Sequence, residues 1–316
     1  MSTAPALPPL PGAPGGPALP SVEELLADAV AVALPMRVRF RGTDLRHALL
    51  LRGPAGWAEF SPFPEYGPHE CAAWLAAAIE AGWQGWPTPV RQTVPVNATV
   101  PAVAADDVEA VLARYGDGIT AVKVKVAEHG PEGGLVPGSR AADLARVRRV
   151  RALLPHAQVR VDANAGWTPA EAVDVLTALA DVGLEYAEQP VPGITDLAEV
   201  RAELRARGVP TPIAADEAVR KAEDPLAVAA AGAADLIVVK VQPLGGVRRA
   251  AAIVAAAGLP AVVSSALDTS VGIAGGAALA LPRRIPPSSR TSMSLPTAVA
   301  MSGRRRIVAG VPSSLS

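Results

Sequence analysis

The sequence predicts an α/β protein, a (β/α)7β-type TIM barrel with an N-terminal α+β capping domain. From residue 91 onward, short apolar runs typical of strands alternate with Ala-, Leu- and Arg-rich stretches typical of helices. A charged or polar residue lies at the end of each of six apolar runs, with spacings of 37, 26, 28, 24 and 24 residues: Lys125, Asp162, Glu188, Asp216, Lys240 and Ser264. Each interval accommodates one strand and one helix.

The same alternation is also compatible with an open, doubly wound sheet. A dinucleotide-binding sheet of that type carries a G-x-G-x-x-G turn after its first strand, and no such turn stands there. The barrel is therefore favoured. Two junctions fit the expected helices, because Thr168–Pro169 is typical of a helix start and Gly258–Pro260 of a helix end.

Four segments are expected along the chain. Residues 1–20 are rich in Pro, Gly and Ala and carry no charge, which indicates a disordered leader. Residues 21–90 combine short extended runs with one apolar helical run, "ECAAWLAAAIEAGW", and are expected to form the capping domain. Residues 91–282 are the barrel and catalytic domain, and residues 283–316 are an atypical tail rich in Arg, Ser and Pro.

The tail puts the eighth strand of the barrel in doubt. Residues 283–316 hold eight serines, six arginines and four prolines but no acid, so they carry +6 and leave −7 for the rest of the chain. Only "RIVAGV", residues 306–311, suits a strand, and its flanks are typical of disorder. We hypothesise that the tail is foreign to the fold, as a shifted reading frame would make it.

Composition narrows the classes of function. The net charge of −1 and the pI near 6.5 give no basic footprint for nucleic acid or an anionic membrane. There is no signal peptide and no apolar run long enough to span a bilayer, and a single cysteine, Cys71, rules out an internal disulfide. We expect a cytoplasmic enzyme with a small-molecule substrate and no evident obligatory protein partner.

The strand "ITAVKVKVAE", residues 119–128, places two lysines on one face, because Lys123 and Lys125 are two residues apart. An amphipathic edge strand with its lysines in water would have the same pattern. In a closed barrel, one strand face points inward, and both amines would then approach the acids at the ends of the neighbouring strands.

Three of these strand-end residues are acids, Asp162, Glu188 and Asp216. Taken singly, each is as well explained as a helix cap or turn residue. Together in a barrel they would converge, and three carboxylates in a low-dielectric site need a cation if all are to ionise. An all-oxygen ligand set favours Mg²⁺, with Mn²⁺ as the alternative; zinc more often uses His or Cys, and no histidine stands at these strand ends.

At this point the sequence resembles the enolase superfamily, in its muconate-lactonizing-enzyme branch. The resemblance is carried by "KVK", "VDANAGW", "EYAEQP", "ADEA" and "IVVKVQPLGG". Within that branch, "RFRGTDLRHALLLRGPAGWAEFSPFPEY" and "SSALDTSVGIAGG" are most similar to the o-succinylbenzoate synthases of menaquinone biosynthesis, particularly the actinobacterial ones. The resemblance covers roughly residues 30 to 280.

The resemblance implies a role for each of these positions. The three acids would be the Mg²⁺ ligands, and Lys125 and Lys240 would lie on opposite faces of a carboxylate substrate, with Lys123 supporting Lys125. The implied reaction is the elimination of water from a cyclohexadiene carboxylate that carries a succinyl group. Ser264, Ser265 and Asn164 would bind the substrate, although the two serines suit a turn equally well.

Two alternatives stay open. Racemization of N-succinylamino acids or epimerization of dipeptides would use the same lysines, acting as acid and base on opposite faces. An inactive barrel or a misfolded product is the alternative of another class, motivated by residues 283–316. The presence of both Lys125 and Lys240 argues against an inactive scaffold, since buried lysines are costly without a chemical role.

Overall fold

A computed structural model describes residues 7–13, 15–40, 43–88, 93–130, 134–280, 293–294 and 306–308, with backbone alone at 37–40, 43, 293–294 and 306–308. The chain forms two compact units. The first unit comprises residues 1–95, 239–256 and 263–316, and the second comprises 96–238 and 257–262. Residues 1–6 and 14 of the predicted leader lie outside the described residues, and the predicted domain boundaries stay predictions.

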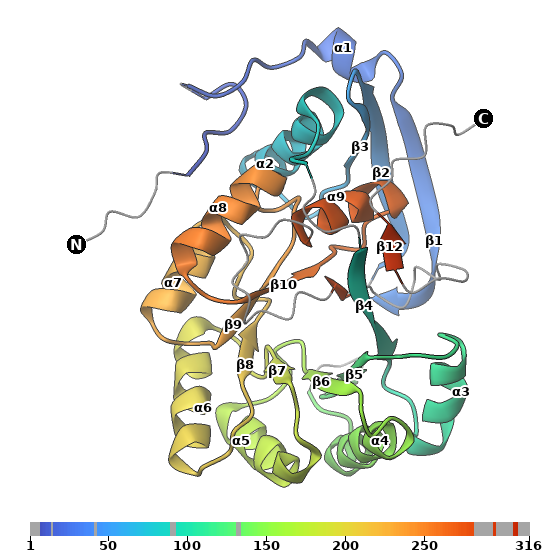
Figure 1. Ribbon diagram of the computed structural model, residues 1–316, viewed down its shortest axis with the longest axis vertical. Helices are drawn as coiled ribbons and strands as arrows, with labels where there is room; N and C mark the ends of the chain where they lie inside the picture. The colour runs from blue at the N-terminus through green and yellow to red at the C-terminus, as the bar shows by residue number, and fades with distance from the viewer. Residues whose placement is uncertain are drawn as a thin grey trace. The chain divides into compact units, whose positions relative to one another are not determined.

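Seven strands follow one another in sequence order across one sheet (Figure 1). They are β4 (Thr93–Val100), β5 (Ala121–Lys125), β6 (Gln158–Asp162), β7 (Tyr186–Glu188), β8 (Ile213–Ala215), β9 (Leu236–Val239) and β10 (Ala261–Ser264). Every adjacent pair from β4 to β9 is parallel. Apart from Val96, their valines and alanines are buried, which is typical of a parallel sheet covered on both faces. The predicted βα repeat is confirmed.

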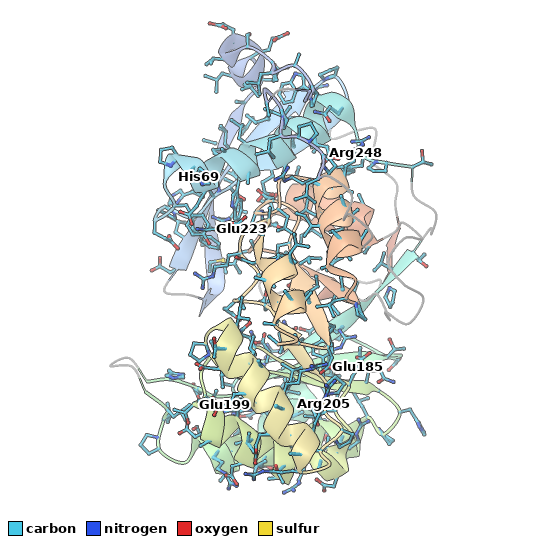
Figure 2. The ribbon with its side chains drawn as sticks, turned by 90° about the vertical axis from the view of Figure 1, so that its left-hand side faces the viewer. His69, Glu185, Glu199, Arg205, Glu223 and Arg248 are labelled. Atoms are coloured by element: carbon cyan, nitrogen blue, oxygen red, sulfur yellow. The ribbon has the colours of Figure 1, made fainter. Side chains whose placement is uncertain are left out.

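Helices connect these strands within the second unit: α3 (Val108–Ala113), α4 (Ser139–Leu153), α5 (Pro169–Ala178), α6 (Ile194–Ala206) and α7 (Asp224–Ala230). Short 3-10 turns precede α3 (Ala105–Asp107) and follow α5 (Ala180–Val182). On α6, Leu197, Val200 and Leu204 are buried, whereas Glu199 and Arg205 are exposed (Figure 2). Spacings of three and four residues thus give each helix one apolar side for the sheet.

The two predicted helix boundaries are confirmed. Thr168 is the N-cap of α5: its side chain accepts a hydrogen bond from the Glu171 amide, while the Glu171 carboxylate accepts from the Thr168 amide, which is a capping box. Helix α8 (Val247–Ala257) ends directly before Gly258, whose φ of 66° is in the left-handed region that favours glycine.

The first unit contains an antiparallel sheet made of β1 (Val30–Phe40), β2 (Thr43–Gly53) and β3 (Gly56–Phe60). It also holds α1 (Val22–Leu26), α2 (Pro68–Ile79) with a π turn (Glu80–Gln84), α8 and α9 (Ser270–Ala280). One buried cluster brings Phe63 and Trp74 against Ala266 and Leu267. Two segments far apart in the chain therefore share one hydrophobic core. The predicted α+β capping element is confirmed.

Two buried carboxylates hold the N-termini of the last helices in this unit. Glu80 accepts hydrogen bonds from the Arg248 amide at 3.1 Å and from its guanidinium at 2.8 Å, at the start of α8. Glu59 accepts from the backbone amides of Thr269, at 3.0 Å, and Gly272, at 2.9 Å, at the start of α9. Both acids satisfy amides that lack intrahelical partners and lie at the positive end of the helix dipole.

The tail supplies two short strands. β11 (Met293–Ser294) pairs in parallel with Val263 and Ser264 of β10 and also neighbours β4. β12 (Arg306–Val308) runs antiparallel to Thr93–Pro95 of β4, within the run 306–311 that the sequence indicated. The strand at 293–294 was not expected. The rest of 283–316 lies outside the described residues, so the hypothesis of a foreign tail stays a prediction.

Candidate active site

The two lysines of β5 lie on the strand face that also carries the acids of β6 and β7. Lys123 and Lys125 are in register with Arg160 and Asp162, and Asp162 is in register with Glu188. Strand β5 is paired on both sides, with β4 and with β6, and Lys123 is only 6% exposed. The alternative of an edge strand with its lysines in water is therefore wrong.

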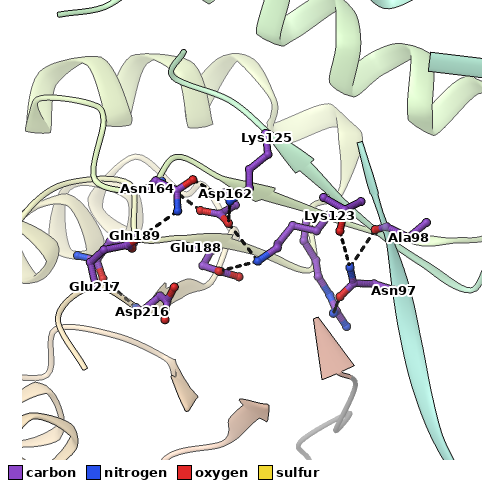
Figure 3. Close-up of polar contacts among 12 residues, drawn as sticks. Asn97, Ala98, Lys123, Lys125, Asp162, Asn164, Glu188, Gln189, Asp216 and Glu217 are labelled. Carbon is purple, nitrogen blue, oxygen red and sulfur yellow. Dashed lines mark hydrogen bonds and ion pairs between the residues drawn. The ribbon is translucent and has the colours of Figure 1, made fainter. Parts of the chain in front are cut away.

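Asp162 is the centre of this group (Figure 3). Its Oδ2 accepts from Lys123 Nζ at 3.0 Å and from Lys125 Nζ at 2.5 Å, and its Oδ1 accepts from the Asn164 amide at 3.1 Å. Burial would raise the pKa of this carboxyl, but the two ammonium groups outweigh burial and hold its pKa well below the usual range. Asp162 is thus ionised at any physiological pH.

The pKa of Glu188 is shifted in the opposite direction. Its Oε1 accepts from Lys123 Nζ at 2.8 Å, and its Oε2 is buried with no hydrogen-bond partner among the described residues. Burial, together with the negative charges of Asp162 and Asp216, raises the pKa of Glu188 to about 8. Another cation near Glu188 would favour the ionised form of this carboxyl.

The backbone is strained directly after strands β6 and β7. Asn164 and Gln189 have φ values of 46° and 37°, which non-glycine residues rarely adopt. Gln189 Oε1 accepts from the amides of Asp216, at 2.8 Å, and Ala218, at 3.1 Å, and so ties the end of β7 to the end of β8. Gln189 was not predicted as a site residue, although it lies inside "EYAEQP".

A divalent cation fits this donor set. The acids are Asp162, Glu188 and Asp216, all oxygen donors, and Glu188 Oε2 is an unused buried acceptor among the described side chains. Among the described ranges, no three acid, His or Cys side chains are already arranged to hold a metal ion. Lys123 Nζ contacts both Asp162 and Glu188.

The side chain of Asn164 contacts the amine of Lys125. Its Oδ1 accepts from Lys125 Nζ at 2.7 Å, and its Nδ2 donates to Glu217 Oε1 at 3.0 Å. Asn164 therefore fixes the position of the amine in this structure (Figure 3). Its predicted contact with substrate stays a prediction.

A buried ion pair of α4, Asp143 and Arg146, contacts the end of β5 and was not predicted from the sequence. Asp143 Oδ2 accepts from the Ala127 amide at 2.9 Å, and Arg146 donates to the Lys125 carbonyl at 2.8 Å and to Asp143 Oδ1 at 2.8 Å. Asp143 and Arg146 are 1% and 2% exposed. In the sequence they stand among exposed arginines of the same helix, and nothing local separates them.

Three further predicted residues belong to the first unit. Lys240 follows β9 and is half-buried. Ser264 ends β10, Ser265 follows it, and both serines are buried. Ser265 Oγ has no hydrogen-bond partner among the described residues. The predicted place of these residues around a substrate, with Lys240 opposite Lys125, stays a prediction.

The sheet and its strand-end acids and lysines define an enolase-type enzyme. The family models "Enolase C-terminal domain-like" and "Enolase N-terminal domain-like" match residues 104–301 and 31–82. The o-succinylbenzoate synthase of Thermobifida fusca is 54% identical over 79% of this chain and 75% of its own. That of Mycobacterium tuberculosis H37Rv is 54% identical over 84% of this chain and 77% of its own. The chain belongs to the o-succinylbenzoate synthase family of the enolase superfamily.

Solved structures show the same fold at lower identity. The L-Ala-D/L-Glu epimerase from Bacillus subtilis has a TM-score of 0.66 at 24% identity, covering 84% of this chain and 88% of its own. The N-succinyl Arg/Lys racemase from Bacillus cereus has a TM-score of 0.68 at 19% identity, covering 84% and 85%. None of the helices in the described part of the chain has the length and apolar character needed to cross a bilayer.

Proposed function

We propose that the protein is an o-succinylbenzoate synthase of menaquinone biosynthesis. It would eliminate water from a hydroxycyclohexadiene carboxylate that carries a succinyl group, which leaves an aromatic ring. The observation that carries this proposal is the identity of 53–54% to proteins of that name over 79–84% of this chain. The cytoplasmic location expected from the sequence stays a prediction.

Lys125 is proposed as the base. Its uncharged amine would take the proton from the carbon next to the substrate carboxylate, and the same ammonium would then return that proton to the departing hydroxyl, which leaves as water. The C–H and C–O bonds break, a C=C bond forms, and Lys125 is restored. Its contacts support this role, because Asp162 and Asn164 hold Nζ at one fixed position at the strand end.

Lys123 is proposed to remain charged throughout. The fields of Asp162 and Glu188 outweigh burial and raise the pKa of its amine well above the usual value. Lys123 would thus keep a fixed positive charge beside Lys125. Lys123 thereby assists the base without touching the reacting carbon.

Asp162, Glu188 and Asp216 are proposed to hold one Mg²⁺. When bound, the ion supplies positive charge where the substrate carboxylate gains negative charge as its neighbouring carbon loses a proton. The support is the donor set, the unused Glu188 Oε2 and the mutual repulsion of the three acids. Asn164 and Gln189 would keep the strand ends in place around it.

Lys240, Ser264 and Ser265 are proposed to complete the site. A protonated Lys240 would stabilise the planar, negatively charged intermediate by charge and by a cation–π contact. Ser265 Oγ, a buried hydroxyl with no described partner, is available to donate a hydrogen bond to the succinyl carboxylate. Ser264 would assist from the preceding position.

The second candidate is racemization of N-succinylamino acids or epimerization of dipeptides. It would use Lys125 and Lys240 as acid and base in turn, so the same residues serve it. The printed names of the similar structures include racemases and epimerases, but identities of 24% or less establish the fold alone. The relatives at 53–54% identity therefore favour elimination.

A spectroscopic assay tests the proposal. Purified protein is given the succinyl-hydroxycyclohexadiene carboxylate and, separately, N-succinyl amino acids, with Mg²⁺ and after exhaustive chelation. We expect Mg²⁺-dependent elimination as the faster reaction, abolished in Lys125→Ala and retained in Arg148→Met, which changes an exposed residue of α4. Racemization faster than elimination would favour the second candidate, and loss of neither in Lys125→Ala would overturn the assigned base.

A further inference from the structure

The ion pair of α4 contacts the main chain of the residue that carries the proposed base. Arg146 and Asp143 are 2% and 1% exposed, and their charged atoms lie 2.8 Å apart. Arg146 Nη1 donates to the carbonyl of Lys125 at 2.8 Å, and its Nε donates to the carbonyl of Val103 at 2.5 Å. Arg146 therefore joins the end of β5 to the segment that follows β4, and it does so through backbone atoms and not through the amine of Lys125.

The backbone of residues 125–127 leaves the strand in a conformation that the ion pair holds. The Ala127 amide donates to Asp143 Oδ2 at 2.9 Å, and the Val126 amide donates to the Asp162 carbonyl at 3.0 Å. Ala127 has a φ of 57°, a left-handed value that residues other than glycine rarely adopt. Such a conformation persists only where its surroundings fix it, and at Ala127 the carboxylate of Asp143 does so.

The loop after β6 packs closely on this turn. A Cβ added at Gly166 would lie 2.8 Å from the Cβ of Ala127 and 2.7 Å from the Cε1 of His129, so the two segments leave no room for a side chain between them. The same loop carries Asn164, whose Oδ1 accepts from Lys125 Nζ at 2.7 Å. A shift of Ala127 would therefore also displace a partner of the Lys125 amine.

The geometry of the base depends on where β5 lies relative to β6. Asp162 ends β6 and Asn164 follows it, and both contact Lys125 Nζ, whereas the side chain of Lys125 starts from β5. An uncharged amine has two N–H donors, one for each of these oxygens, and a single lone pair. The direction of the lone pair is then set by the two oxygens on the side of β6 and by the backbone of Lys125 on the side of β5.

We propose that Arg146 and Asp143 are positioning residues for the base Lys125. By fixing the backbone of β5 at the residue that carries the amine, they keep the lone pair directed at the substrate carbon from which the proton is taken. This inference rests on the proposed function, in which Lys125 is the base. It gives α4 a part in the rate of proton transfer and none in the binding of substrate.

The second unit offers a matched pair at the other edge of its sheet. Arg201, on α6, donates to Asp235 Oδ1 at 2.6 Å, and Asp235 Oδ2 accepts from the amide of Ile213 at 2.9 Å, where β8 begins. An arginine, an aspartate and a strand amide are thus joined in the same way as at β5, but at the amino-terminal end of a strand. In barrels, residues at that edge contribute to stability and not to chemistry.

Steady-state kinetics of elimination in the presence of Mg²⁺ test this role. Arg146→Lys keeps the charge, but one ammonium cannot replace the planar fork that binds two carbonyls and Asp143. We expect kcat to fall about tenfold or more, because a misplacement of about 1 Å can cost about 100-fold in rate. KM and the affinity for Mg²⁺ should stay within about threefold of wild type, since binding groups are not moved. Arg201→Lys, the matched control, should keep kcat within about twofold.

Three results would overturn the positioning role. They are a kcat within about twofold of wild type in folded Arg146→Lys, a rise in KM in place of a fall in kcat, and an equal fall of kcat in Arg201→Lys. If Arg146→Lys does not fold, Asp143→Asn decides, because it keeps the shape of the side chain and removes the ion pair. We expect its kcat to fall about fivefold or more, against less than about twofold in the control Asp235→Asn, and equal values in the two variants would overturn the role.

Crystal structures of wild type and variant judge the placement of the amine without reference to activity. In Arg146→Lys we expect Lys125 Nζ to move by about 0.5 Å or more relative to Asp162, which is the tolerance for a catalytic group. A shift below about 0.2 Å would overturn the positioning role, whatever the kinetics. Absence of elimination in the wild-type protein would instead overturn the proposed function, and the position of Nζ would still decide whether the ion pair places the amine.

Discussion

Asp162 differs from the other two acids because it is the one on which both lysines of β5 converge. Lys123 and Lys125 keep Asp162 ionised, whereas burial and two negative charges raise the pKa of Glu188 to about 8. Asp162 and Glu188 pair across neighbouring strands, yet their proton affinities differ because two ammonium groups contact Asp162 and two negative charges act on Glu188.

Removing one of the three acids should weaken metal binding. For Asp162→Asn, Glu188→Gln and Asp216→Asn we expect Mg²⁺ affinity to fall at least about tenfold, because an amide oxygen carries no net charge to attract a hard cation. Titration calorimetry would measure it, with Glu199→Gln on exposed α6 as the control. Full affinity in all three amide variants, or full turnover after exhaustive chelation, would contradict the assigned ligands.

The two lysines should differ in their tolerance to substitution. We expect Lys125→Ala to abolish elimination and any racemization, because one base serves both. Lys240→Arg keeps a cation but not a usable base, so it should leave more elimination than racemization. Rate measurements on both substrate types would test this, and an equal loss of both reactions in a folded Lys240→Arg protein would count against the roles.

At the scale of single elements, α4 holds the strand that carries the base. Arg146→Met would leave Asp143 buried without its cation and release the carbonyl of Lys125. Breaking one partner of a buried pair costs about 3–5 kcal/mol, so we expect a loss of that order in the free energy of unfolding by urea. Arg148→Met, an exposed change on the same helix, should cost about 1 kcal/mol or less.

The loop between β10 and α9 should make stability depend on pH. Burial and the charge of Glu59 raise the pKa of Asp268 to about 7 in the folded protein, whereas the pKa of an unfolded Asp is about 3.9. Between these values the folded state alone keeps the proton, so the stability that it contributes falls as pH rises from about 4 to about 7 and is flat above. Urea midpoints in Asp268→Asn should lack this slope; an unchanged slope would contradict the assignment.

The local sequence was sufficient to predict the βα repeat and the grouping of lysines and acids at the strand ends of the second unit. Strand-end acids and the alternating lysines could be predicted because a strand has a period of two and a barrel gathers its strand ends. Glu59 and Glu80 could not, because each holds a helix more than 160 residues away in the chain. Arg146 could not either, because burial of one arginine among several on a helix depends on packing and not on local pattern.

At the scale of the whole molecule, residues 283–316 supply the two strands at the ends of the sheet order, β11 and β12. The unusual composition of 283–316 predicts weak pairing, although 306–308 lie antiparallel to β4. We expect the amides at 306–308 to exchange with solvent faster than those of β9, as measured by hydrogen exchange with mass spectrometry. Exchange across residues 304–312 as slow as in β9 would show a genuine strand and end the hypothesis of a foreign tail.

The core that Phe63 and Trp74 share with Ala266 and Leu267 has a consequence for the order of synthesis. Arg46 and Glu59 leave the ribosome early, yet their partners Leu267 and Gly272 are made more than 210 residues later. At about 5–20 residues per second, the antiparallel sheet waits roughly 10–40 s for the segments that complete its core. A nascent chain that stalls in this interval would present the apolar surfaces of Phe63 and Trp74 to chaperones and proteases.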